Sequence, residues 1–125
     1  MIAGIGTDIV EVSRMAKAID SEHFRQRVFT PREIAYCSGR GKQAAQSFAA
    51  RFAAKEAVLK AFGTGLRGGS LLEIEILNDE LGCPQVYLQG FWAAKAQEKN
   101  VGKVWLSLTH TKEYAAAQCV MEAGK

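Results

Sequence analysis

The sequence predicts an α+β protein, a single domain with a mainly antiparallel sheet and one long central helix. Three observations support this fold class. Helical patterns are concentrated in the first half of the 125-residue chain, and strand-like patterns follow one another in the second half. A long helical pattern at residues 44–62 lies between the two groups. Because helices and strands are grouped rather than alternating along the chain, α+β is favoured over α/β.

The first expected element is a strand over residues 2–10. Its side chains alternate, with Ile5 and Ile9 on one face and two glycines and Asp8 on the other. Glycines let another chain or a ligand approach the backbone closely, so that Asp8 would project from a smooth surface. The more frequent explanation of a lone aspartate is that it caps a turn at the end of a strand.

Helices are expected next, and their start and stop signals are local. Ser13 is a candidate N-cap for the first helix. The second begins with a capping box, in which Thr30 precedes Pro31 and Glu33 follows three residues after the cap. Gly63 ends the third. The expected helices span residues 12–20, 30–37 and 44–62.

The second half is expected to be rich in strands. Alternating patterns bounded by turn residues mark them, and a two-residue connection at 111–112 predicts that the last two form a hairpin. One short helix is expected at residues 90–100. The expected strands span residues 71–77, 84–89, 103–110 and 113–121.

Composition argues against several classes of protein. With 48% hydrophobic and 23% charged residues, the chain is typical of a folded soluble domain rather than a disordered segment. No apolar run approaches the roughly 18 residues that a membrane-spanning helix needs. The first ten residues do not resemble a secretory signal, so we expect a cytoplasmic protein. Three separate cysteines without a CxxC pair predict neither a disulfide framework nor a zinc site.

Positive charge is concentrated in the first half of the chain. Residues 1–67 hold 11 lysines and arginines against 6 acidic residues, whereas the whole chain has a net charge of +3. Such a surface suits an anionic partner, although a solvated charged face is the simpler interpretation. Few aromatic residues stand among the cations, which argues against a platform for single-stranded nucleic acid and leaves an acidic protein at least as suitable.

Four charged residues gather near the end of the 44–62 helix. Lys60 follows Glu56 by four positions, which is typical of an ordinary surface pair worth about 0.2–0.5 kcal/mol. Lys55, in contrast, falls near the middle of the apolar stripe, with Arg51 to one side of it. A cation at that place needs a partner, and a bound phosphate would serve.

Two further groups of residues are candidates for a role in binding or catalysis. The carboxylates of Asp8 and Glu56, together with water and phosphate oxygens, would suit Mg²⁺, although their spacing does not prove that they meet. His110 ends a strand beside two threonines and can donate hydrogen bonds to a phosphate, but a lone histidine is more often a turn residue. No acidic third member accompanies Ser107 and His110, so a hydrolase triad is poorly supported.

Three segments together resemble one protein family. They read GIGTDIVEV, RFAAKEAVLKAFGTG and SLTHTKEYAAA, and they occur in this order. The whole chain resembles holo-acyl-carrier-protein synthase, the small bacterial type of 4′-phosphopantetheinyl transferase. The resemblance implies transfer of 4′-phosphopantetheine from coenzyme A to a serine of apo acyl carrier protein, with release of 3′,5′-ADP, in support of fatty acid biosynthesis. It also implies a need for Mg²⁺ and a homotrimer with active sites between subunits.

The resemblance assigns catalytic roles to three residues. Asp8 and Glu56 would hold Mg²⁺ on the pyrophosphate of coenzyme A, and Lys60 would contact the phosphate. The serine hydroxyl must lose a proton as it attacks, and either Glu56 or a metal-activated water would accept it.

Other residues are expected to bind coenzyme A or the carrier protein. Those assigned to coenzyme A, including its 3′-phosphate, are Lys42, Arg51, Lys55, Lys60, Gly63, Gly65, His110 and Thr111. The glycines belong to a segment, residues 63–69, that would close over the ligand. Those assigned to the acidic recognition helix of the carrier are Arg14, Lys17 and Arg25.

Two other functions remain open at this point. A basic module that binds RNA or an acidic protein would use the positive first half but would leave Asp8 and Glu56 without a role. A Mg²⁺-dependent pyrophosphatase would use the same carboxylates without a carrier protein.

Overall fold

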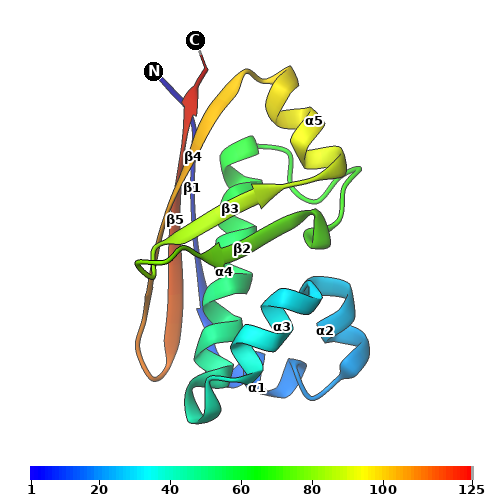
Figure 1. Cartoon of the computed structure of the whole chain (residues 1–125), viewed down its shortest axis with the longest axis vertical. Helices are drawn as coiled ribbons and strands as arrows, with labels where there is room; N and C mark the ends of the chain where they lie inside the picture. The colour runs from blue at the N-terminus through cyan, green and yellow to red at the C-terminus, as the bar shows by residue number, and fades with distance from the viewer. Residues whose placement is uncertain (125) are drawn as a thin grey trace.

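The computed structural model describes residues 1–124 and is built around one long helix that lies on a three-stranded antiparallel sheet (Figure 1). The helix is α4 (Ala44–Phe62). The sheet has the order β1-β5-β4, formed by β1 (Ile2–Glu11), β4 (Val101–His110) and β5 (Tyr114–Ala123). This arrangement confirms the predicted α+β class, the long central helix and the hairpin of the last two strands.

A second, two-stranded sheet crosses α4. Strands β2 (Ile74–Asn78) and β3 (Pro84–Leu88) pair antiparallel, and β3 also contacts β4 (Figure 1). The antiparallel strands therefore form two sheets rather than one. β2 begins later than the expected strand, because Leu71–Glu73 forms a short 3₁₀ helix, η2, whose first turn is capped by the Ser70 side chain.

The remaining helices are short, and two of them differ from the prediction. α1 (Val12–Ala18) follows β1 directly, with Glu11 at the cap position and no side-chain cap, so Ser13 does not cap it. A separate helix, α2, was not expected, and the Ser21 hydroxyl accepts a hydrogen bond from the Phe24 amide at its start. The capping box of α3 is confirmed. The other short helices are α2 (Glu22–Val28), α3 (Pro31–Ser38), α5 (Gly90–Glu98) and the 3₁₀ turn η1 (Gly41–Gln43).

The core has two parts, one between α4 and the three-stranded sheet and one between α4 and the other elements, which includes Phe29, Ile74 and Trp92. Alternate residues of β5 point at the helix and are buried, namely Ala115, Ala117, Cys119 and Met121. The facing side of α4 is rich in alanine, including Ala49, Ala53 and Ala57, all of which are fully buried. Small side chains on both elements bring the helix close to the sheet, and this close packing fixes α4 relative to β1 and β5.

The contact between β1 and α4 depends on two glycines. A Cβ atom added at Gly6 would lie 2.0 Å from the carbonyl oxygen of Ala57, and one added at Gly4 would lie 2.2 Å from that of Ala61. The glycines were expected to admit another chain or a ligand, but the segment that approaches them is α4 of the same chain.

The opposite face of the sheet is open, and exposed apolar side chains lie on it among polar ones such as Thr7 and Gln118. Ile5 and Ile9 of β1 are 70% and 65% exposed, and Trp105 and Tyr114 lie exposed on β4 and β5. Met1 and Ala123 lie at the same end of this sheet, where the Ala123 amide donates a hydrogen bond to the Met1 carbonyl oxygen.

Within residues 1–124, no helix combines the length and the apolar character that crossing a membrane would require.

We predict that Gly6→Ala lowers the free energy of unfolding by about 1–3 kcal/mol, because the new methyl group overlaps a helix carbonyl that cannot move away. Urea denaturation of the purified protein measures this. The matched control is Gly39→Ala, where the nearest atom to the new Cβ is 3.4 Å away and a change within about 0.5 kcal/mol is expected. Equal stability of the two variants would contradict the proposed contact.

Candidate active site

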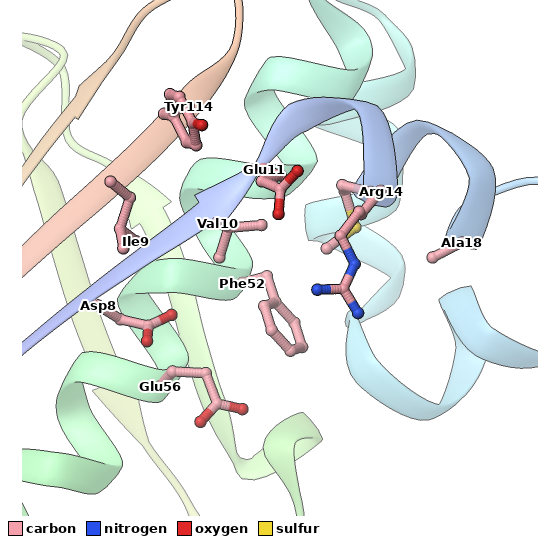
Figure 2. A pocket seen from close by; sticks show the side chains of 10 residues that line it. Asp8, Ile9, Val10, Glu11, Arg14, Ala18, Phe52, Glu56 and Tyr114 are labelled. Atoms are coloured by element: carbon pink, nitrogen blue, oxygen red, sulfur yellow. The ribbon is translucent and has the colours of Figure 1, made fainter.

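Asp8 and Glu56 lie in the wall of one cavity of about 510 Å³. Asp8 comes from β1, two residues after Gly6, and Glu56 comes from the part of α4 on which that strand rests. Figure 2 shows the two carboxyl groups side by side, with Phe52 next to Glu56 and the Arg14 guanidinium on the far side of the hollow. The close approach of β1 to α4 therefore brings together two carboxylates that are far apart in the sequence.

Lys60 contacts Asp8 rather than Glu56. Its Nζ atom lies 3.1 Å from an Asp8 carboxylate oxygen and donates a hydrogen bond to the carbonyl oxygen of Thr7 over 3.0 Å. The helical spacing had suggested a surface pair with Glu56, but β1 supplies a nearer acceptor. Glu56 makes no ion pair with any residue that the structure describes.

The electrostatic environment of Glu56 fits a divalent cation. Partial burial raises the pKa of Glu56, the negative charge of Asp8 raises it further, and Lys60 opposes this shift in part. A divalent cation between the two carboxylates would remove their repulsion, and carboxylate oxygens are the ligands that Mg²⁺ prefers. No group of three or more histidine, cysteine or acidic residues suited to a metal occurs among residues 1–124, so the protein would supply only part of the coordination shell.

Lys55 has a partner inside the protein, which corrects the expectation that a phosphate of coenzyme A binds it. Its side chain is completely buried, and Nζ lies 2.7 Å from a carboxylate oxygen of Glu33, which is also completely buried. Nζ donates a second hydrogen bond to the carbonyl of Leu71. Burial lowers the pKa of Lys55, and the Glu33 carboxylate opposes that shift. A buried cation is tolerated when it is paired and hydrogen-bonded, as here.

A second cavity, of about 200 Å³, contains Arg51 and His110. Tyr36, Arg40 and Asn78 also line it. Arg51 is only 6% exposed, and its Nε atom has no hydrogen-bond acceptor among the described residues. Two arginines and a histidine around one small hollow form a site for an anion.

Comparison with known proteins identifies the family. The family model of the 4′-phosphopantetheinyl transferase superfamily matches residues 4–119. A holo-[acyl-carrier-protein] synthase of Geotalea daltonii is 50% identical over 125 residues, which cover 98% of this chain and 99% of that protein.

The chain belongs to the holo-acyl-carrier-protein synthase family of 4′-phosphopantetheinyl transferases.

Solved structures of this family share the whole fold. The crystal structure of holo-[acyl-carrier-protein] synthase from Neisseria meningitidis matches with a TM-score of 0.89 and 37% identity, covering 98% of this chain and 99% of that one. The enzyme from Bacillus anthracis, solved in complex with CoA (3′,5′-ADP), matches with a TM-score of 0.83 and 39% identity, covering 99% of both chains.

The other residues expected to bind coenzyme A lie near the second cavity or in turns. Lys42 is exposed in η1, between Arg40 and Gln43, both of which line that cavity. The Thr111 hydroxyl accepts hydrogen bonds from the amides of Glu113 and Tyr114, and thus shapes the β4–β5 turn that follows His110.

The two glycines of the predicted closing segment adopt conformations that favour glycine. Gly63 ends α4 with a φ of 79°, which confirms it as the stop signal, and Gly65 has a φ of 64°. Gly63 also lines a hollow together with Thr64, Arg67 and Lys95.

The three residues expected to bind the carrier protein have different environments. Arg14 lines the cavity that holds Asp8 and Glu56. Lys17 is exposed in the last turn of the same helix. Arg25 lies on α2 and donates a hydrogen bond to the carbonyl of Ile19, so its guanidinium is partly engaged within the protein.

Sequence reasoning missed two residues of importance here. Glu33 was recognised only as a capping residue, yet the same carboxylate that accepts from the Thr30 amide also neutralises Lys55. Tyr36 carried no motif, and its ring lies under the Arg51 guanidinium, 4.5 Å from it. Of the two, only Glu33 had a signal in the sequence. Lys55 lies on the apolar stripe of its helix, and a lysine at such a place requires a buried acidic partner.

We predict that Lys55→Met lowers the free energy of unfolding by about 3–5 kcal/mol, because it leaves the Glu33 carboxylate buried without a cation. The double variant Glu33→Gln/Lys55→Met contains no buried charge at this place and should recover part of that loss. Urea denaturation at neutral pH compares the two. Lys60→Met, which removes an exposed cation from the same helix, should cost less than about 1 kcal/mol. A double variant less stable than Lys55→Met would contradict this account.

We also predict a pH-dependent effect of Glu56→Gln on stability. The pKa of Glu56 is raised in the folded chain. Its favourable contribution to the free energy of unfolding is therefore present below the ordinary glutamate pKa and is lost as the pH rises through the raised value. Without metal, Glu56→Gln should therefore gain stability relative to the natural protein as the pH rises through that interval. Thermal unfolding from pH 4 to pH 8 measures the difference, and Glu80→Gln, at an exposed turn glutamate, should follow the natural curve. A difference that does not change with pH would contradict the assigned environment.

Proposed function

We propose that the protein transfers 4′-phosphopantetheine from coenzyme A to a serine hydroxyl of apo acyl carrier protein and releases 3′,5′-ADP, with Mg²⁺ as cofactor. The observation that carries this proposal is the convergence of Asp8 and Glu56 at one cavity, with Lys60 3.1 Å from Asp8, in a chain that belongs to the transferase family. The reaction would take place in the cytoplasm and serve fatty acid biosynthesis.

Asp8 and Glu56 would hold Mg²⁺, and the Lys60 ammonium would face the phosphate. Transfer of a phosphoryl group demands positioning and charge neutralisation more than covalent help from the protein. When bound, Mg²⁺ would neutralise charge on the diphosphate of coenzyme A. Lys60, which is exposed and held beside Asp8 over 3.1 Å, adds a second positive charge for the leaving 3′,5′-ADP.

We propose that Glu56 is the general base that accepts the proton of the attacking serine hydroxyl. The serine oxygen forms a bond to the phosphorus that carries pantetheine, the bond from that phosphorus to the oxygen of 3′,5′-ADP breaks, and the hydroxyl proton must leave. Asp8 is already paired with Lys60, whereas Glu56 has no cation partner in the part of the chain that is described.

The nucleotide end of coenzyme A would occupy the second cavity. Arg51 and His110 line it, and Lys42 lies in the turn at its edge. These groups can donate charge-assisted hydrogen bonds to the 3′-phosphate. Thr111 would act mainly by shaping the turn next to His110, and Gly63 and Gly65 would give the following segment the freedom to close over the ligand.

The carrier protein would dock beside the first cavity. Arg14 lies at the cavity and Lys17 one turn further along α1, so that both can meet an acidic helix while its serine approaches Glu56. Arg25 would contribute from α2 with the part of its guanidinium that the Ile19 carbonyl leaves free.

A homotrimer would complete the active site. The two cavities have no lining residue in common on one chain. The exposed side chains of Ile5, Ile9 and Trp105 on the open face of the sheet are apolar surface that association would remove from water. We propose that the nucleotide cavity of one subunit adjoins the carboxylate cavity of its neighbour.

Mass spectrometry of the carrier protein tests the proposal. The full-length protein is incubated with apo acyl carrier protein, coenzyme A and Mg²⁺, and the carrier should gain one phosphopantetheine. Cleavage of coenzyme A with an unmodified carrier would indicate a pyrophosphatase instead. The absence of any turnover would indicate a binding module without catalytic activity.

In the same assay, Asp8→Ala and Glu56→Ala should each reduce transfer by at least about a hundredfold, as expected when charge stabilisation in the transition state is removed. Glu98→Ala, at an exposed glutamate of α5, is the matched control and should retain activity. Circular dichroism verifies that both cavity variants remain folded. Full activity of either would contradict the assigned metal site.

A further inference from the structure

The Arg51 side chain is held in place without an acidic partner. It is 6% exposed, it makes no ion pair with any carboxylate of residues 1–124, and its Nε atom has no acceptor there. Arg40 lines the same cavity, so a second positive charge stands nearby. A buried, unpaired guanidinium next to another cation needs a different source of stabilisation.

The ring of Tyr36 supplies that stabilisation. The central carbon of the Arg51 guanidinium lies 4.5 Å from the ring centroid, and that of Arg40 lies 5.8 Å from it. The negative face of an aromatic ring attracts a guanidinium. This attraction does not use the N–H groups of the guanidinium, which stay free for other acceptors. The Asn78 side chain donates a hydrogen bond to the Tyr36 hydroxyl over 3.2 Å, which restrains the ring further.

We propose that Tyr36 is a positioning residue, which holds Arg51 ready for the 3′-phosphate of the nucleotide and so makes the protein prefer 3′-phosphorylated donors. A carboxylate partner would hold Arg51 equally well, but it would repel the incoming phosphate. An aromatic ring orients the guanidinium and leaves its hydrogen-bond donors and its charge available. This inference rests on the proposed function, because it assumes that the second cavity receives the nucleotide end of coenzyme A.

Calorimetric titration of the whole protein separates this role from general stability. Adenosine 3′,5′-bisphosphate and adenosine 5′-monophosphate are the two probes, and their ratio of affinities measures the contribution of the 3′-phosphate. Tyr36→Leu should reduce this ratio by roughly three- to thirtyfold, as expected for a desolvated cation–π contact, with little change for the monophosphate. Tyr36→Phe retains the ring and should restore most of the preference.

Two further variants make the result specific. Tyr87→Leu removes an exposed tyrosine of β3 outside the cavity and should leave the ratio unchanged. Tyr36→Gln is a second ring-free variant, which serves if Tyr36→Leu does not fold. The same comparison is then made in the transfer assay with coenzyme A and 3′-dephospho-coenzyme A, where KM for coenzyme A should rise and kcat should remain.

Four results would overturn the inference. The natural protein could bind both nucleotides equally, a ring-free variant could keep the full preference, it could weaken both nucleotides to the same extent, or Tyr36→Phe could lose as much as Tyr36→Leu. Failure of the proposed function looks different, since the nucleotide preference and its loss would be present while no phosphopantetheine is transferred.

Discussion

The candidate site depends on the close approach of β1 to α4. Gly4 and Gly6 leave no room for a side chain between the strand and the helix carbonyls, and Asp8 follows them on the same face. That geometry sets Asp8 beside Glu56 and within reach of Lys60. Two like charges at one cavity are unfavourable without a cation, so the packing that stabilises the fold also creates the electrostatic demand that a metal ion would meet.

The buried pair of Lys55 and Glu33 is the second constraint on α4. It joins the helix to α3, and the other Glu33 oxygen accepts from the Ile76 amide, which joins both to β2. Consecutive residues of α4 therefore have separate tasks. Lys55 anchors the helix from within, while Glu56 faces a cavity whose wall is formed by β1 and α1. An anchored helix is a suitable support for groups that must be held at fixed positions.

Several elements could be predicted because their signals are local. The α4 boundaries, the capping box of α3 and the β4–β5 hairpin follow from spacing, caps and turn residues within a few positions. α2 was missed, although Ser21, whose side chain caps its first turn, was a local start signal. For the site, the residue types were apparent, but their meeting was not. Their carboxylates suggested Mg²⁺ ligation, but only the resemblance to a family placed Asp8 and Glu56 at one site, because no local pattern joins positions so far apart.

The sequence by itself determined which chemical groups the protein has, the order of its motifs and most of its secondary structure. It also determined the angle of about 100° between the side chains of Lys55 and Glu56, since helix geometry fixes it. Only the tertiary structure decided that Glu56 faces a cavity together with Asp8, that Glu33 rather than a ligand neutralises Lys55, and that Tyr36 lies against Arg51. The physical reason is that burial and charge pairing depend on which distant segments cover each side of a helix, and a local pattern contains no information on that.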